Sequence, residues 1–90
     1  MSLNDYCDEV QRFMLGLEKD KVFSSSIIIT LIEQEFATLK ININNKVIVD
    51  HQLYDLLFLL LELAVYNKTD LDSEWLLGKE KKKKYLVKKI

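Results

Sequence analysis

Residues 50–66 read DHQLYDLLFLLLELAVY, and this stretch decides the fold of the chain. Its apolar residues lie on nearly all sides of a helix, because successive residues are separated by roughly 100° around the helix axis. A helix of this kind belongs in the middle of a bundle or in an interface between subunits. We therefore expect a central helix that starts at Asp50, a good N-cap residue, and runs to about Asn67.

The sequence on both sides predicts further helices. Apolar residues spaced by three and four predict a helix over residues 3–19, capped by Ser2 or Asn4. A last helix is expected to begin at Asp70 or Asp72 and to end in lysines. The chain contains no proline and only two glycines, so nothing in the composition opposes long helices.

The segment before the central helix is less uniform. Residues 26–40 fit a helix whose apolar face carries Ile28, Ile32, Phe36 and Leu39. The pattern then alternates, which is typical of a strand, and Asn44-Asn45 is a two-residue turn signal. We expect a helix over 26–40 and an extended connection over 41–49, and a hairpin within this connection is an open alternative.

The composition bounds the architecture and the compartment. Ninety residues form one domain, 1–90, and 49% of them are apolar, which is more than a small monomer easily buries. The sequence thus predicts an all-α four-helix bundle that assembles as a homodimer or homotetramer. The single cysteine, Cys7, excludes an internal disulfide, and no signal-peptide pattern is visible, so we expect a cytoplasmic protein. The longest apolar run is too short for a membrane span, so no membrane partner is expected.

The charge is divided between the two ends of the chain. Residues 79–90 hold seven of the 13 basic residues and one of the 14 acidic residues, which gives this end +6. Residues 1–78 then carry −7, and the formal net charge is −1. An acidic body with a basic end favours a phosphate-bearing small molecule over a nucleic acid as partner. The alternative, which we favour for any single lysine, is a solvated last helical turn whose lysines complement the helix dipole.

One acidic residue interrupts the apolar central helix. Asp55 directly precedes Leu-Leu-Phe-Leu-Leu-Leu, and a carboxylate in such a place needs a partner, a proton or a metal ion. Glu33, in the middle of the second helix, is the natural partner, because carboxylates on facing helices can hold divalent cations. The sequence leaves the alternative open that both carboxylates reach solvent at helix edges.

The stretch DHQLYDLLFLLLELAVYNKTDLDSEWLLGKEKKKKY, residues 50–85, resembles the second half of the MazG-like nucleotide pyrophosphohydrolases. That family shows a Glu-x-x-Asp motif that leads into an apolar helix, followed by a short turn and an aspartate-initiated helix ending in lysines and an aromatic residue. The segments LNDYCDEVQRFM and LIEQEFATLK are similar, more loosely, to the family's first helix and to its Glu-Glu-x-x-Glu segment. The resemblance implies a four-helix MazG-like bundle.

The resemblance also implies a site, because two carboxylate pairs of the family bind magnesium and so hold a nucleoside triphosphate. The first pair falls on Gln34 and Ala37, the second pair on Gln52 and Asp55, and a preceding glutamate on Glu33. Only Asp55 and Glu33 keep their carboxylates. The resemblance therefore makes these two the expected magnesium ligands and, if the protein is active, its catalytic residues.

The resemblance also implies further ligand-binding residues. Gln34 and Gln52 are expected beside the ligand, and Lys79, Lys82 and Lys83 correspond to basic residues that face the triphosphate in the family. Glu35 does not simply replace a missing carboxylate, since it points roughly 200° around the helix from Glu33.

Three functions stand as hypotheses. The first is a degenerate MazG-like domain that binds a nucleotide or nucleotide-like phosphate ligand without efficient turnover, since glutamine and alanine give no charge to a metal cluster. The second is a minimal magnesium-dependent pyrophosphohydrolase that converts nucleoside triphosphates to monophosphates and pyrophosphate, because substrate phosphates can complete the shell of a sparsely held ion. The third is a small helical module of phage or mobile-element origin that binds a host protein.

Overall fold

The computed structural model of the chain describes residues 1–17 and 24–88, and these ranges form four helices. They are α1 (Leu3–Leu17), α2 (Ser25–Asn44), α3 (Asp50–Tyr66) and α4 (Leu71–Lys88). No strand occurs in the described ranges, which confirms the all-α prediction. The predicted helix end at residue 19 lies outside them. None of the four helices is both long and apolar enough to cross a membrane.

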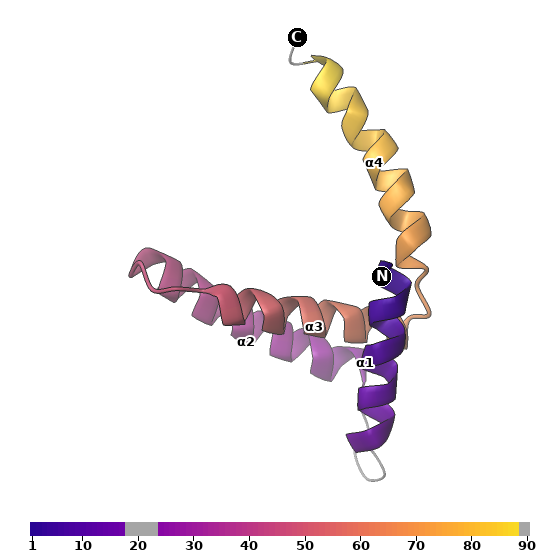
Figure 1. Cartoon of the computed structure of the whole chain (residues 1–90). Coiled ribbons are helices and arrows are strands. Elements are labelled where there is room, and N and C mark those ends of the chain that lie inside the picture. Colours follow the sequence, from indigo (N-terminus) through magenta and orange to yellow (C-terminus); the bar gives the residue numbers. More distant parts are fainter. Residues whose placement is uncertain (18–23, 89–90) are drawn as a thin grey trace.

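The helices are arranged around α3 (Figure 1). α2 and α3 run side by side in opposite directions, and α1 crosses the end of this pair. α4 starts beside the N-terminus of α1 and points away from the α2–α3 pair. The central place predicted for residues 50–66 is confirmed, since α3 packs against both α1 and α2.

The second helix is longer than predicted. α2 continues to Asn44, so the expectation of an extended connection is wrong for residues 41–44. The helix ends in a Schellman motif: the amide of Lys46 donates to the carbonyl of Ile43, and the amide of Val47 donates to that of Asn42. Lys46 has the positive φ of 58° that is typical of this helix ending. Residues 47–49 have no regular structure, so the alternative of a hairpin within residues 41–49 is not formed.

Capping side chains explain where two of the helices begin. Ser2 accepts the amide of Asp5 at 3.2 Å, and Asp5 accepts the amide of Ser2 at 2.9 Å, which confirms Ser2 as a cap of α1. Ser24 caps α2 by accepting an amide of its first turn. The prediction that Asp50 is the N-cap of α3 is wrong. Asp50 is the first helical residue, where its charge complements the helix dipole, and the N-cap Val49 offers no side-chain hydrogen bond.

The main core lies where α1 crosses α3. Its buried centre is formed by Cys7, Val10, Leu61 and Ala64, with Met14, Phe58, Val65 and Leu71 packed around them. Cys7 is therefore a core residue, and burial raises the pKa of its thiol.

α2 contributes a second buried surface on the side that meets α3. Ile28 and Leu39 are buried, and Ile32 and Glu35 between them are half-buried. The prediction that Phe36 shares this face is wrong, because its side chain is exposed. At roughly 100° per residue, Glu35 lies within about 20° of Ile28 around the helix, whereas Phe36 lies about 80° away.

The chain is more open than a compact domain of its size. Its radius of gyration is 15.9 Å, whereas a compact domain of this length has roughly 12 Å. The accessible surface is 7532 Å², whereas a folded monomer of this mass exposes roughly 5,500 Å². The predicted self-association stays a prediction, and the excess surface supports it.

The N-termini of α1 and α4 cap each other. The side-chain oxygen of Asn4 accepts the amides of Leu71 and Asp72, and the Asp72 carboxylate accepts the amide of Leu3 at 2.9 Å. Asn4 also donates to Asp70, and this hydrogen bond is the main cause that lowers the pKa of the Asp70 carboxyl. Because the ionised form is favoured in the fold, this contribution to stability is present above the usual pKa of aspartate and is lost as pH falls through the lowered value.

Replacing Asn4 by alanine tests this junction. We expect Asn4→Ala to lower the free energy of unfolding by roughly 0.5–2 kcal/mol, the range for the loss of a helix cap. The change removes the acceptor of the first amides of α4 and a donor to Asp70. Urea unfolding at a fixed protein concentration measures the difference. Asn44→Ala, at an exposed position at the end of α2, is the matched control and should change stability by less than about 0.5 kcal/mol.

Candidate functional site

Asp55 and residues of α2 line a small pocket between α2 and α3. The pocket has a volume of about 310 Å³ and is lined by Leu31, Gln34 and Glu35 of α2 and by Asp55, Phe58 and Leu59 of α3. Two carboxylates and one carboxamide from facing helices thus line one open pocket. Of the residues that the resemblance implied, the structure brings Asp55 and Gln34 together here.

The second carboxylate at this pocket is Glu35. Glu35 is half-buried on the face of α2 that meets α3, whereas Glu33 is exposed and does not line the pocket. The same helix geometry that separates these two glutamates places Glu35 in line with Ile28 and Leu39. The role of Glu33 stays a prediction of the resemblance, and Glu35 is the residue that sequence reasoning missed. The feature of the sequence that could have identified Glu35 is its position seven residues after Ile28, which places both residues on the same side of a helix.

Asp55 also pairs with a histidine on its own helix. The Nε2 atom of His51 lies 3.3 Å from the Oδ2 atom of Asp55, one helical turn away. The His51 side chain is 85% exposed and that of Asp55 is 34% exposed, so solvent screens this contact. Asp55 therefore remains accessible to a ligand from the solvent side.

Two other polar residues of α3 are at least partly buried. The side-chain oxygen of Gln52 is buried and has no hydrogen-bond partner within the described parts of the chain. Glu62 is buried as well, and neither residue lines the pocket at Asp55. A buried carbonyl oxygen without a partner is costly, so Gln52 is a place where an added donor or cation would be stabilised.

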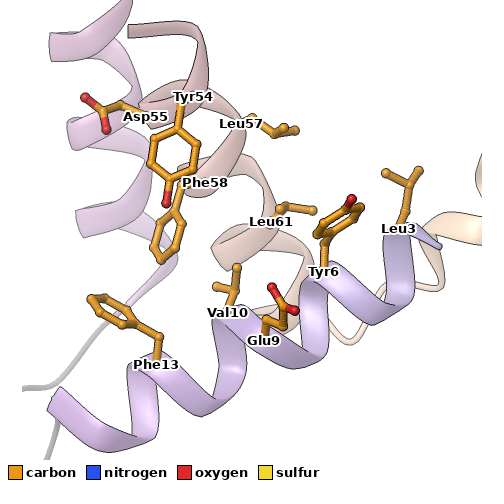
Figure 2. A pocket seen from close by; sticks show the side chains of 10 residues that line it. All are labelled: Leu3, Tyr6, Glu9, Val10, Phe13, Tyr54, Asp55, Leu57, Phe58 and Leu61. Atoms are coloured by element: carbon orange, nitrogen blue, oxygen red, sulfur yellow. The ribbon is translucent and has the colours of Figure 1, made fainter. Parts of the chain in front are cut away.

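A larger groove lies on the other side of Asp55, between α1 and α3 (Figure 2). It has a volume of about 760 Å³, and its lining residues are Leu3, Tyr6, Glu9, Val10, Phe13, Tyr54, Asp55, Leu57, Phe58 and Leu61. The rings of Phe13 and Phe58 meet edge to face at 5.4 Å, and Tyr54 lies 6.1 Å from Phe58. The groove is therefore apolar and aromatic, and Glu9 and Asp55 add negative charge to it.

The three predicted lysines lie apart from this region within one chain. Lys79, Lys82 and Lys83 are exposed on α4, which points away from the α2–α3 pair (Figure 1). Lys83 pairs with Glu80 on its own helix, with 3.0 Å between Nζ and Oε1. None of the three lines a pocket with Asp55. Their role at a ligand stays a prediction.

The carboxylates at the pocket are few for a metal site. Across residues 1–17 and 24–88, no three His, Cys, Asp or Glu side chains are grouped so that they could hold a metal ion. Glu35 and Asp55 nevertheless offer the hard oxygen ligands that magnesium prefers, and this ion is often held by one or two carboxylates plus substrate phosphates. The chemistry of these two side chains suits a magnesium ion that arrives with a phosphate ligand, and they do not form a dedicated cage.

Comparison of the chain with protein-family models, with curated proteins and with solved structures finds no match in any of the three.

Proposed function

We propose that the chain is a catalytically reduced MazG-like domain that binds a nucleotide or a related phosphate-bearing molecule at Asp55 and Glu35 without efficient turnover. The observation that carries the proposal is the pocket between α2 and α3 that is lined by these two carboxylates and by Gln34. Two facing helices that each supply a carboxylate are the arrangement with which helical bundles hold divalent cations.

The residues at the pocket support binding more than catalysis. Asp55 and Glu35 would hold one magnesium ion against phosphate oxygens, and the Gln34 amide would donate a hydrogen bond to the same phosphates. The motif positions that the resemblance assigns to Gln34, Ala37 and Gln52 carry no charge. A cluster of metal ions that also activates water needs more anionic ligands than this pocket provides.

The test is a binding and turnover measurement on the full chain. The purified protein is incubated with magnesium and a nucleotide panel that includes cyclic and dinucleotide species, and mass spectrometry follows both bound ligand and product. An intact nucleotide that binds only with magnesium supports the proposal. Catalytic release of monophosphate and pyrophosphate would instead establish the minimal pyrophosphohydrolase.

A second candidate function rests on a different observation. The chain exposes roughly 2,000 Å² more surface than a folded monomer of its mass, and exposed apolar side chains are found on every helix. Large exposed apolar surface is typical of a protein-interaction module. A protein that binds no member of the nucleotide panel, with or without magnesium, would favour this function over ligand binding.

A further inference from the structure

The groove between α1 and α3 has apolar walls that are not covered within the described chain. Phe13, Tyr54 and Leu57 line it, and each is about half exposed. Figure 2 shows Phe13 on α1 and Tyr54 and Leu57 on α3. The buried Val10 and Leu61 line the same groove. An aromatic groove of this size costs free energy when it faces water, so an apolar occupant would be stabilised there.

α4 is the element of the described chain with the fewest tertiary contacts. It packs mainly against α1 through its first turn, where Leu71 joins the core. Farther along, Trp75, Leu76 and Leu77 are exposed, and Trp75 exposes 66% of its surface. A side chain added at Gly78 would meet nothing within 4 Å. Trp75, Leu76 and Leu77 are therefore largely uncovered by the described residues of their own chain.

The amount of open surface matches what a stable interface needs. The excess of roughly 2,000 Å² over a compact monomer is larger than the share of about 800 Å² that one partner buries in a standard protein interface. A reciprocal pairing of two copies buries two grooves and two copies of α4 at once, because a twofold interface uses each surface twice.

The charges of the two surfaces are complementary. Glu9 and Asp55 place carboxylates at the groove, within a body that carries −7 over residues 1–78. The half of α4 after Gly78 belongs to the segment with +6. The mutual caps at Asn4 and Asp72 hold the start of α4 on the N-terminus of α1, and from there the helix leads away from the α2–α3 pair (Figure 1). A second copy of the chain offers the same helix without this constraint.

We propose that the α1–α3 groove binds α4 of a second copy of the chain, with the apolar residues around Trp75 in the groove and the lysines after Gly78 beside Glu9 and Asp55. The exchange is reciprocal and gives a twofold dimer. Asp55 also lines the pocket between α2 and α3, but the groove binds α4 without needing a ligand in that pocket.

The single tryptophan makes this contact measurable in the unmodified protein. In a monomer, Trp75 is exposed and its emission is that of a hydrated indole. Docking in the groove removes water from the ring and shifts the emission to shorter wavelength. Sedimentation and fluorescence over one concentration series should therefore give the same midpoint. A chain that stays monomeric at all concentrations, or a dimer whose Trp75 emission remains that of the monomer, would overturn the proposal.

Two variants locate the contact. Leu57→Glu places a charge in the groove and Trp75→Glu places one on α4, and each should raise the dimer dissociation constant at least roughly tenfold. Ile48→Glu, at an 83% exposed position outside the groove, is the matched control and should associate like the original chain. Circular dichroism confirms that each variant is folded.

Mixing the two variants is the most selective arm of the experiment. The Leu57→Glu chain keeps an intact α4 and the Trp75→Glu chain keeps an intact groove, so one of the two contacts can form in a mixed dimer. We expect the mixture to associate more strongly than either variant alone, with the remaining Trp75 shifted to shorter wavelength. A mixture that associates no better than its components, or a Leu57→Glu chain that associates like Ile48→Glu, would show that copies meet through another face.

Discussion

Replacing Ile28 by alanine is expected to lower the free energy of unfolding by roughly 2–5 kcal/mol. Ile28 lies on the side of α2 that meets α3, and its side chain is 0% exposed. The change removes buried methyl and methylene groups and leaves a cavity that the neighbouring side chains fill only in part. A domain of 90 residues has roughly 5–13 kcal/mol of stability, so this loss is a large fraction of the total.

Ile29→Ala is the matched control for Ile28→Ala. It changes the same residue type at the next position of the same helix, so the difference in intrinsic helix propensity is identical. Ile29 is about half exposed, and its replacement should cost less than about 1 kcal/mol. Urea unfolding followed by circular dichroism compares both variants at one protein concentration, because association adds to apparent stability. Equal losses for the two variants would contradict the packing of α2 on α3.

The four helices could be predicted from the sequence because their signals act within a few residues. The apolar spacing of α1 and the aspartates at the start of α4 are local signals. The end of α2 was mispredicted because Ile41 and Ile43 have strand propensity, and only their place in the structure decides between helix and strand. In the fold, Leu39 is buried and Asn42 is half-buried, so the inner face of α2 continues past residue 40.

The candidate site could be predicted only in part. Asp55 could be singled out because a carboxylate in an apolar helix needs a partner, a proton or a metal ion. The structure places it at a pocket that Gln34 also lines. The choice between Glu33 and Glu35 depends on which side of α2 faces α3, and a difference of two residues changes that side completely. The groove between α1 and α3 was not predictable, because it arises from the crossing of two helices that lie far apart in the sequence.

The second large effect is expected at the pocket between α2 and α3. Asp55→Asn and Glu35→Gln should each weaken magnesium-dependent nucleotide binding at least roughly tenfold, since even outer-shell partners of metal ligands contribute 10- to 100-fold to affinity. Both replacements keep the size of the side chain and remove one negative charge. Calorimetric titration of the full chain with the best ligand of the nucleotide panel, with and without magnesium, measures the change.

Glu33→Gln is the control that decides between the two glutamates of α2. Glu33 is exposed and outside the pocket, so this variant should bind the ligand like the original chain. The charge removed is the same as in Glu35→Gln, and therefore a general electrostatic effect would weaken both variants alike. If Glu33→Gln weakens binding and Glu35→Gln does not, the assignment implied by the MazG-like resemblance holds, and Glu33 rather than Glu35 acts with Asp55. If Asp55→Asn binds with unchanged affinity, the ligand lies elsewhere and the pocket between α2 and α3 is not its site.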